Sequence, residues 1–495
     1  MICVSIGRGR HRHLMAEHLR LKQCGAKLVE LRLDYINRVP QLKRLLENRP
    51  TPVIVTCRRE RDGGKFTGSE EQRLMLLREA IVEGVEYVDL EDDIAGSVPR
   101  FGKTKRIVSH HDFRKTPDDL EELHEHLASL DADIVKIATM ANSPHDNIRM
   151  LKLIANAKVP TVGLCMGDIG TPSRILAGKF GAPFTYATFH HERALAPGQI
   201  SFEQMRDIYH YEQINADTVV YGVVADPVGH SLSPQIHNAS FRQQGINAVY
   251  LPFRVPRQYL SQFVDDAPAI GLKGLSVTIP HKEAIAEKLT KVDKAVKGIA
   301  AVNTVVYKDG ELVGYNTDYK AAMDAIEKGM GQLGADPSPL AGKTALILGA
   351  GGAARAIAYG LKRRGAAFVI SNRTPERAEK LAEEFGGCAV KWNMRYSTSA
   401  DVLINCTPIG MHPDVDESPY DKLRLPPSIF VFDTVYNPET TLLLKDARSR
   451  GCDTATGVEM FIRQASLQYY LFTGREAPTD VMLDALRRSI GAERR

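Results

Sequence analysis

One lysine interrupts the otherwise apolar stretch ADIVKIATM at residues 132–140. Because strand side chains alternate between two faces, Lys136 shares a face with Ile134 and Ala138. Desolvation favours the neutral amine, which is the form that attacks a carbonyl to make a Schiff base. The alternative is a lysine that pairs with a nearby carboxylate or extends its charge past the strand end. The stretch therefore predicts either a nucleophile or a buried ion pair.

Two adjacent histidines end another predicted strand, in the stretch SHHDFRKTP at residues 109–117. An imidazole exchanges protons near neutral pH, so one of them could move protons on an imine at Lys136. Strand periodicity alone does not choose between His110 and His111. Other charged residues fall late in, or just after, their strands. Arginines could clamp a carboxylate while a glutamate accepts hydrogen bonds from hydroxyl groups; these residues are Arg32, Arg58, Arg174 and Glu30.

Eight β-branched runs alternate with helical patterns in the first 190 residues. Eight such βα units in about 210 residues predict a (β/α)8 barrel, whose active site lies at the C-terminal ends of its strands. The runs are ICVSI, AKLVELRLD, PVIVTCR, VEYVDLE, KRIVSHHDF, DIVKIAT, VPTVGLCMG and PFTYATF.

A second α/β segment follows a boundary near residue 215 and ends at the Gly/Pro-rich connector MGQLGADPSPLAGK. The third segment begins with a strand, a glycine turn and a helix in direct succession, which is the start of a doubly wound Rossmann fold. We expect one domain at 1–214, a substrate-binding lobe at 219–326 completed by helices at 457–495, and a nucleotide-binding lobe at 340–456.

The stretch LILGAGGAARAIA places Gly349, Gly351 and Ala354 in a G-x-G-x-x-A pattern between that strand and helix. Glycines let the backbone approach a pyrophosphate at a helix N-terminus. The next strand ends in SNRTPER without an acidic residue, and Arg373 and Arg377 are placed to meet a 2′-phosphate. NADP is therefore favoured over NAD, the alternative being two solvent-facing arginines.

Polar residues interrupt the strand-like text of the middle segment. Lys282 and Asp318 could form a proton-transfer pair beside a carbonyl that receives a hydride. The hydroxyl groups of Ser231 and Ser233 suit a carboxylate. Isolated residues of these types also serve as helix caps and turn residues.

Composition excludes several classes of protein. The chain has 495 residues, a formal net charge of +4 and 43% hydrophobic residues, as in an ordinary globular protein of two to four domains. Nothing in this balance calls for nucleic acid or a membrane surface. Seven cysteines without a C-x-x-C pair fit neither a disulfide framework nor a zinc site. No signal-peptide pattern opens the chain, so we expect a cytoplasmic protein without a metal site.

Residues 1 to about 212 resemble type I 3-dehydroquinate dehydratase through VELRLDY, TCRRERDGGKFTG, SHHDF, ADIVKIA, MGDIGTPSR and ALAPGQIS. The resemblance implies that Lys136 is the Schiff-base nucleophile and that His111 is the general acid and base. The residues it implies for substrate binding are Ser5, Glu30, Arg32, Arg58, Arg174 and Gln199.

Two positions depart from that family's pattern. Asp62 stands where the family usually has a glutamate that orients the histidine, so the same role is reached by a shorter side chain. Leu195 stands where a serine often precedes A-P-G-Q, which removes one hydroxyl contact.

Residues 219–495 resemble shikimate dehydrogenase through HSLSPQIHN, VTIPHK, AVNT, YNTD, GAGGAARA, NRT, NCTPIGM, FDTVYNP and GVEMFIRQA. The resemblance implies Lys282 and Asp318 as the catalytic pair, and Ser276 replaces an asparagine common before V-T. Implied substrate contacts are Ser231, Ser233, Thr278, Asn303, Tyr436 and Gln464. Expected cofactor contacts are Gly349, Ala350, Gly351, Gly352, Ala353, Asn372, Arg373, Thr374, Arg377, Thr407 and Gly457.

The two resemblances imply consecutive reactions, since 3-dehydroshikimate is the product of the first and the substrate of the second. We expect dehydration of 3-dehydroquinate followed by NADPH-dependent reduction to shikimate. One alternative is a dehydrogenase that acts mainly on quinate with NAD. Another is a sensor that binds such intermediates without turnover, although four retained catalytic residues argue against it. The sequence leaves the oligomeric state open.

Overall fold

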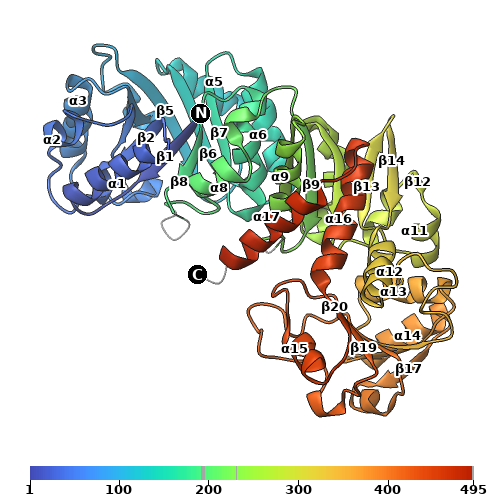
Figure 1. Cartoon of the computed structure of the whole chain (residues 1–495). Coiled ribbons are helices and arrows are strands. Elements are labelled where there is room, and N and C mark those ends of the chain that lie inside the picture. Colours follow the sequence, from blue (N-terminus) through green and yellow to red (C-terminus); the bar gives the residue numbers. More distant parts are fainter. Residues whose placement is uncertain (191–194, 230, 493–495) are drawn as a thin grey trace. The chain divides into compact units, whose positions relative to one another are not determined.

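The computed structural model describes residues 1–190, 195–229 and 231–492 (Figure 1). The chain divides into two compact units. The first comprises Met1–Pro234 and Asn247–Leu272, and the second comprises Gln235–Ile246 and Lys273–Arg495. This division does not follow the boundary expected near residue 215, so the three domain ranges stay a prediction. Within the described ranges, no helix is both long and apolar enough to cross a membrane.

The first unit contains an eight-stranded sheet in the order β7-β6-β5-β4-β3-β2-β1-β8, with parallel pairing between neighbours. This order confirms the barrel predicted from eight βα units. The strands are β1 (Ile2–Ile6), β2 (Leu28–Arg32), β3 (Val53–Thr56), β4 (Tyr87–Glu91), β5 (Lys105–Asp112), β6 (Ile134–Met140), β7 (Thr161–Met166) and β8 (Thr185–Thr188).

Helices follow the strands and surround them (Figure 1). Local sequence signals begin several of these helices. Ser69, for example, accepts a hydrogen bond from the Gln72 backbone in a capping box that starts α3. The helices are α1 (His11–Gln23), α2 (Leu42–Leu46), α3 (Glu70–Val82), α4 (Asp92–Ala95), α5 (Leu120–Ser129), α6 (Pro144–Asn156), α7 (Thr171–Leu176) and α8 (Phe202–Asp207).

Apolar side chains fill the inside of the barrel beneath its charged end. Ile134 and Ala138 belong to this buried cluster, as strand alternation requires of residues two positions from Lys136. Phe184, just before β8, and Tyr186 of β8 belong to the same cluster and make an edge-to-face contact at 5.7 Å between ring centroids. Lys136 therefore projects inward from a strand whose other inward side chains are apolar.

Two further strands complete the first unit, β9 (Val219–Ala225) and β10 (Ala248–Arg254), which pair in parallel. Helix α10 (Leu260–Asp266) packs against α6. At this contact His145 Nδ1 lies 2.7 Å from Asp266 Oδ2.

In the second unit, β11 (Leu272–Val277) pairs antiparallel with β13 (Thr304–Lys308). Strand β13 pairs antiparallel with β14 (Glu311–Tyr315), and β14 pairs in parallel with β12 (Lys291–Val292). The accompanying helices are α9 (Ser233–Gln243), α11 (Lys294–Ile299), α12 (Asp318–Gly329), α16 (Gly457–Thr473) and α17 (Thr479–Ala492). Helix α16 packs against both α12 and β13.

The third sheet is parallel, with the order β17-β16-β15-β18-β19-β20 of a Rossmann fold. This confirms the predicted doubly wound fold. Its strands are β15 (Thr344–Leu348), β16 (Ala367–Asn372), β17 (Cys388–Lys391), β18 (Val402–Asn405), β19 (Phe430–Asp433) and β20 (Thr454–Ala455). Its helices are α13 (Gly352–Arg363), α14 (Pro375–Phe385) and α15 (Leu442–Ser449).

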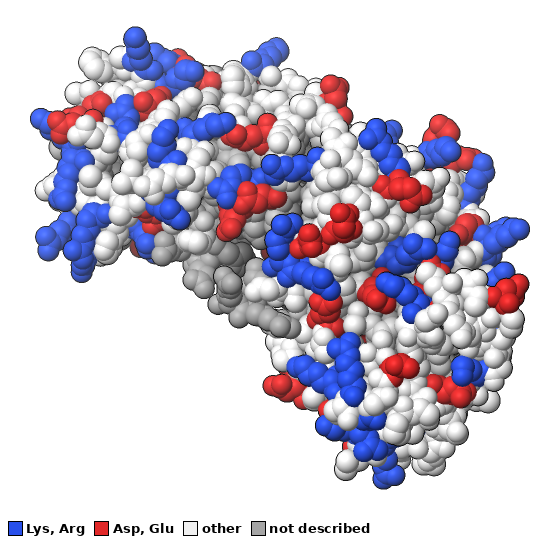
Figure 2. Space-filling model, in the orientation of Figure 1, with Lys and Arg blue, Asp and Glu red and all other residues white. Residues whose placement is uncertain are grey.

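Acidic and basic side chains are interspersed over the face drawn in Figure 2. This mixture agrees with a net charge near neutrality on a chain of this length. Attraction for an anionic ligand must therefore come from groups inside a cavity.

Candidate active sites

A cavity opens at the C-terminal end of the barrel strands and gathers all nine site residues predicted for this half of the chain, together with Leu195. Those lining it are Ser5, Glu30, Arg32, Arg58, Asp62, His111, Lys136, Arg174, Leu195 and Gln199. The sequence prediction missed seven other lining residues, which are Gly63, Phe113, Ala138, Leu164, Met166, Tyr186 and Ala196.

Lys136 is 5% exposed and is paired within the cavity wall. Its Nζ donates to Asp89 Oδ2 at 2.8 Å and lies 3.7 Å from Glu30 Oε1. The structure is compatible with both predictions for Lys136, a nucleophile and a buried ion pair. The lysine is buried at the barrel mouth and its amine is also paired with carboxylates. A nucleophilic amine at this place must first give up a proton to a neighbouring base.

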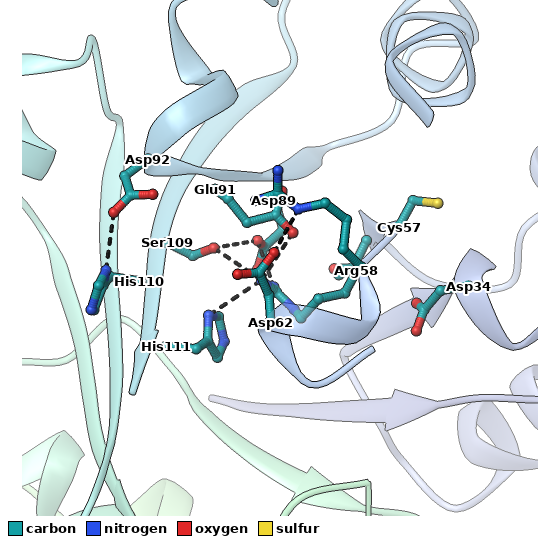
Figure 3. Close-up of polar contacts among 12 residues, drawn as sticks. Asp34, Cys57, Arg58, Asp62, Asp89, Glu91, Asp92, Ser109, His110 and His111 are labelled. Carbon is teal, nitrogen blue, oxygen red and sulfur yellow. Dashed lines mark hydrogen bonds and ion pairs between the residues drawn. The ribbon is translucent and has the colours of Figure 1, made fainter. Parts of the chain in front are cut away.

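Asp89 also accepts hydrogen bonds from an arginine and a serine (Figure 3). Its Oδ1 accepts hydrogen bonds from Arg58 at 2.7 Å and from Ser109 at 2.6 Å. Burial alone would raise the pKa of Asp89, but Arg58, Lys136 and His111 hold it well below its usual range. Asp89 is thus an anion that balances two buried cations.

The sequence analysis missed Asp89 and Glu91, although a signal for both was present. They stand two residues apart in YVDLE, so strand alternation places them on one face of β4. Glu91 accepts hydrogen bonds from Arg58 at 3.2 Å and from Arg73 at 2.7 Å. Two acidic residues on the inward face of a barrel strand indicate partners for buried cations.

His111, and not His110, lines the cavity. Its Nδ1 lies 3.2 Å from Arg58 Nη1, and its ring stacks on Phe113 with centroids 6.4 Å apart. Burial, followed by Arg58 and Lys136, lowers the pKa of His111 well below its usual value. A neutral imidazole can accept a proton from a bound substrate.

His110 lies apart from these residues and contacts Asp92 at 3.0 Å (Figure 3). The hydrogen bond to Asp92 raises the pKa of His110. The structure therefore distinguishes the two histidines that periodicity left open, because they belong to opposite faces of one strand.

Asp62 pairs with Arg59 in the structure, so its role in orienting His111 stays a prediction. The Asp62 carboxylate accepts a hydrogen bond from Arg59 Nε at 2.6 Å, and the described residues include no hydrogen bond between Asp62 and His111. Asp62 ends the short helix at Glu60–Asp62, and Arg59, which directly precedes this helix, is close enough to bind its carboxylate. Arg58 is the polar group beside the imidazole instead.

Arg174 is a buried cation without an acidic partner among the described residues. It is 1% exposed, and its guanidinium donates to Pro197 O at 3.4 Å while Nε has no acceptor. Burial lowers the pKa of Arg174 to about 10. Arg32, by contrast, pairs with Asp34 at 2.8 Å. An unbalanced guanidinium in a cavity favours a carboxylate ligand.

The remaining predicted side chains of this cavity make local hydrogen bonds. Glu30 accepts from Ser5 at 2.6 Å and from Thr56 at 2.8 Å. Gln199 Oε1 accepts from the Leu195 backbone at 2.7 Å. Ser5 and Thr56 thereby fix the Glu30 carboxylate at the cavity wall.

The neutral state of His111 predicts a pH effect on stability. Above pH 6.5 neither the folded nor the unfolded chain protonates this residue, but below it only the unfolded chain does so. His111 therefore lowers the free energy of unfolding by up to about 1.4 kcal/mol for each pH unit below 6.5. We expect the loss between pH 7 and pH 5, measured by urea unfolding, to be smaller in His111→Asn. Equal losses in both proteins would contradict this assignment.

In the second unit, Lys282 Nζ donates to Asp318 Oδ2 at 2.6 Å. Asn303 Nδ2 donates to the other carboxylate oxygen at 2.8 Å. The Lys282 stem also lies near the nucleotide-binding lobe, since a Cβ added to Gly352 would be 3.1 Å from its Cδ. The predicted pair is thus assembled beside the N-terminal end of α13.

Gln468 supports this pair from helix α16 and was missed in the sequence. Its Nε2 donates to Asn303 O and to Thr304 Oγ1, both at 3.0 Å. Its Oε1 accepts from Ser276 Oγ at 2.8 Å. The Ser276 departure therefore has a partner in the protein, and Gln468 holds the segment that positions Asp318.

Replacing Gln468 with leucine should leave Asn303 without this support. We expect kcat/KM of the dehydrogenase reaction to fall on the order of tenfold, the size of one buried hydrogen-bond loss. An unchanged unfolding midpoint of the dehydrogenase half in urea serves as the folding control, and the barrel reaction should be unaffected. Unchanged dehydrogenase kinetics would show that Asn303 and Asp318 keep their places without Gln468.

Other predicted substrate contacts of the second unit make local contacts with their neighbours. Tyr436 stacks on Phe461 with centroids 4.3 Å apart, and Gln464 Nε2 donates to Phe461 O at 3.0 Å. Thr317 donates to Gln464 O at 3.3 Å. Thr278 follows β11, and its carbonyl accepts from the His281 backbone at 2.8 Å.

Ser231 and Ser233 belong to the first unit. The Ser231 hydroxyl accepts a hydrogen bond from the Ser233 backbone at 3.4 Å, at the start of α9. This is the local cap-like contact that the sequence analysis named as the alternative. Their role toward a carboxylate stays a prediction.

The glycine turn after β15 fits a dinucleotide. Gly349 has φ +107°, and a Cβ there would lie 2.9 Å from Cys406 O, so a side chain is excluded on both counts. Gly351 precedes α13 in an extended conformation, and a Cβ there would meet open space. The open space and the free N-terminal backbone of α13 suit a pyrophosphate.

The residues predicted for the rest of the cofactor follow β16 and β18. Arg373 and Arg377 are exposed and form no ion pair with the described residues. Asn372 donates to Thr374 O at 2.9 Å, and Thr407 donates to Asn405 Oδ1 at 2.6 Å. The two arginines are therefore available to a phosphate beyond the glycine turn. The other predicted residues, Ala350, Gly352 and Ala353, belong to the turn and the first turn of α13, and Gly457 begins α16.

Four family models match the chain over separate segments. Type I 3-dehydroquinase matches residues 2–216. The shikimate dehydrogenase substrate binding domain matches residues 223–305, and shikimate / quinate 5-dehydrogenase matches residues 333–417. The shikimate 5′-dehydrogenase C-terminal domain matches residues 457–487.

One relative is similar to nearly the whole chain. The chloroplastic bifunctional 3-dehydroquinate dehydratase/shikimate dehydrogenase of Arabidopsis thaliana is 40% identical, over 97% of this chain and 83% of its own. The NADP(+) shikimate dehydrogenase of Moorella thermoacetica is 42% identical, over 57% of this chain and 96% of its own.

Solved structures are similar to the second half of the chain. Shikimate dehydrogenase from Thermus thermophilus, in complex with NADP(H) and shikimate, matches with a TM-score of 0.50 and 34% identity, covering 55% of this chain and all of its own. Quinate dehydrogenase from Corynebacterium glutamicum, in complex with NAD, matches with a TM-score of 0.50 and 30% identity, covering 55% and 99%.

Proposed function

Because the chain belongs to the family of bifunctional 3-dehydroquinate dehydratase/shikimate dehydrogenases, we propose that it catalyses both reactions in sequence. The barrel dehydrates 3-dehydroquinate to 3-dehydroshikimate, and the second half reduces that ketone to shikimate. The observation that carries the proposal is the presence of two separate lysine–aspartate pairs, at Lys136 with Asp89 and at Lys282 with Asp318.

We assign the dehydratase to residues 1–214. The substrate lobe of the dehydrogenase comprises residues 219–326 with helices 457–495, and the nucleotide lobe comprises residues 340–456. The separate ranges of the four matching family models support these assignments.

In the barrel, Arg174 holds the substrate carboxylate and the Lys136 amine attacks the ketone carbon. The carbonyl oxygen leaves as water as the carbon–nitrogen double bond of the imine forms. His111 accepts a proton from the carbon next to the imine and donates one to the departing hydroxyl group, so a second water leaves. Water then hydrolyses the imine and returns the amine to Lys136. The neutral imidazole beside Lys136 supports this assignment.

The substrate hydroxyl groups bind to Glu30, whose position Ser5 and Thr56 fix. Arg32, Arg58 and Gln199 complete the binding wall. Arg58 also donates to Asp89, so one side chain links the substrate cavity to the counter-ion of the nucleophile.

In the dehydrogenase, bound NADPH supplies a hydride to the ketone carbon. Lys282 and Asp318 supply the proton that the resulting alkoxide oxygen takes up. Asn303 keeps the Asp318 carboxylate directed toward Lys282. Their hydrogen-bonded geometry beside the start of α13 supports the assignment.

We propose NADP as the cofactor because Arg373 and Arg377 are exposed and without carboxylate partners among the described residues at the end of β16. The double substitution Arg373→Ala with Arg377→Ala should raise KM for NADPH on the order of 10- to 100-fold, the loss of a charge-assisted phosphate contact. KM for NADH should change little, and Lys380→Ala on the same helix is the control. A preference of the unaltered protein for NAD with quinate would support the quinate dehydrogenase alternative.

We further propose that the protein acts in a reducing compartment, such as the cytoplasm, on small molecules alone. All seven cysteines are free, which supports this placement. Detection of disulfides by mass spectrometry of the non-reduced protein from its source cells would contradict it.

The test of the proposed function uses the purified chain with 3-dehydroquinate and NADPH. Shikimate should form and NADPH should be oxidised without any added enzyme. If neither dehydration nor NADPH oxidation occurs, the protein is a sensor that binds the intermediates without turnover.

A further inference from the structure

The barrel cavity contains a buried phenol that the proposed mechanism does not use. Tyr186 of β8 is 4% exposed and lines the cavity together with Lys136 and Glu30. Its hydroxyl group has no hydrogen-bond partner among the described residues. A buried hydroxyl group without a partner is unfavourable, because it has given up its hydrogen bonds to water. In an enzyme cavity, a ligand atom is the natural partner for such a group.

The Tyr186 ring fixes where this hydroxyl lies relative to the nucleophile. Lys136 Nζ lies 4.3 Å from the ring centroid, within the range of a cation–π contact. Phe184 also packs edge to face with the Tyr186 ring, with centroids 5.7 Å apart. With two neighbours holding the ring, its hydroxyl is positioned before a substrate arrives.

Tyr186 also remains a donor throughout the working pH range. Burial raises the pKa of Tyr186 well above its usual value, and the Glu30 carboxylate raises it further. Glu30 accepts hydrogen bonds from two protein hydroxyl groups, and its Oε1 lies 3.7 Å from Lys136 Nζ. A ligand atom beside Nζ therefore lies within reach of a carboxylate acceptor and a phenol donor.

We propose that the Tyr186 hydroxyl group donates a hydrogen bond to the substrate hydroxyl group next to the reacting ketone, and so acts as a specificity-determining residue. The carbon that bonds to Nζ is the ketone carbon, so its neighbouring hydroxyl is the ligand group closest to Tyr186 and Glu30. That hydroxyl group donates a hydrogen bond to the Glu30 carboxylate and accepts one from the Tyr186 hydroxyl group. This inference rests on the proposed dehydratase function.

The test compares Tyr186→Phe with the unaltered enzyme on two substrates, 3-dehydroquinate and its analogue lacking the hydroxyl next to the ketone. With 3-dehydroquinate, KM should rise about tenfold in Tyr186→Phe, the size of one hydrogen bond, while kcat changes less than twofold. With the deoxy analogue, the two enzymes should have the same KM. Tyr87→Phe, which changes another barrel tyrosine outside the cavity wall, should match the unaltered enzyme on both substrates.

Two results would overturn the inference: an unchanged KM for 3-dehydroquinate in Tyr186→Phe, or an equal rise on both substrates. The kcat of dehydration, which should change less than twofold, reports whether the barrel of Tyr186→Phe is folded. If the unaltered chain itself fails to dehydrate 3-dehydroquinate, the proposed function fails, which is a different outcome from an active chain in which Tyr186→Phe behaves normally.

Discussion

Lys136→Met should lower kcat of the dehydratase on the order of 10⁴-fold or more, the effect of removing a covalent nucleophile. Methionine fills a similar volume but has no amine to attack the ketone. The change also removes one of the cations around Asp89, although Arg58 and Ser109 still donate to that carboxylate. We therefore expect a loss of about 1–3 kcal/mol in stability, too little to unfold the barrel.

Dehydrogenase activity in the same protein is the internal control for Lys136→Met and should stay within twofold of the unaltered value. Lys115→Met removes an exposed lysine shortly after the His111 strand and should leave both activities intact. Substantial dehydration by Lys136→Met, measured by the appearance of the conjugated product, would exclude the imine route.

Lys282→Met should have the converse effect, with kcat of NADPH oxidation falling about 10²- to 10⁴-fold, the contribution of a positioned proton donor. Its side chain is only partly buried, so folding should be preserved. In Asp318→Asn, kcat of NADPH oxidation should fall by a similar factor, because Lys282 then loses its carboxylate acceptor at 2.6 Å. The double variant should be scarcely slower than either single one, since the two residues act as a unit.

Dehydratase activity should be unchanged in both variants. Lys297→Met, which alters an exposed lysine on α11, is the matched control. If the two single losses multiply in the double variant, Lys282 and Asp318 act independently, and the proton-transfer pair is the wrong description.

The sequence predicted those barrel-site residues whose inward or outward orientation follows from strand alternation. Lys136 faces inward with the apolar Ile134 and Ala138, and Glu30 faces inward two residues after the apolar Leu28. The (β/α)8 pattern places their strands around one cavity. The glycine turn of the nucleotide lobe was equally predictable, because strand, turn and helix are contiguous in the chain.

Side-chain contacts between residues of different strands and loops were harder to predict from the sequence. Asp62 was expected to orient His111, but in the structure its carboxylate accepts a hydrogen bond from Arg59. Which of several nearby arginines pairs with Asp62 depends on side-chain lengths and positions in three dimensions. Asp89 was missed although alternation in β4 makes it face inward. Asp89 is the counter-ion of both Lys136 and Arg58, and a buried cation on one barrel strand requires such an acidic residue on a nearby strand.

Gln468 shows a different limit. It lies 165 residues from Asn303 in the chain, and no local pattern links a glutamine in a C-terminal helix to a loop beside β13. Tyr186 was also missed, because an aromatic residue in a buried strand is equally typical of a residue that only packs in the core. Its hydroxyl group, unpaired among the described residues, is what distinguishes it from a packing residue.

The measurement closest to the central claim is borohydride reduction in the presence of 3-dehydroquinate, followed by mass spectrometry of the digested protein. Borohydride converts an imine into a stable amine, so a trapped intermediate stays on the residue that formed it. We predict an adduct on the peptide containing Lys136 and none in Lys136→Met. An unmodified Lys136 peptide in a preparation that actively dehydrates the substrate would contradict the account.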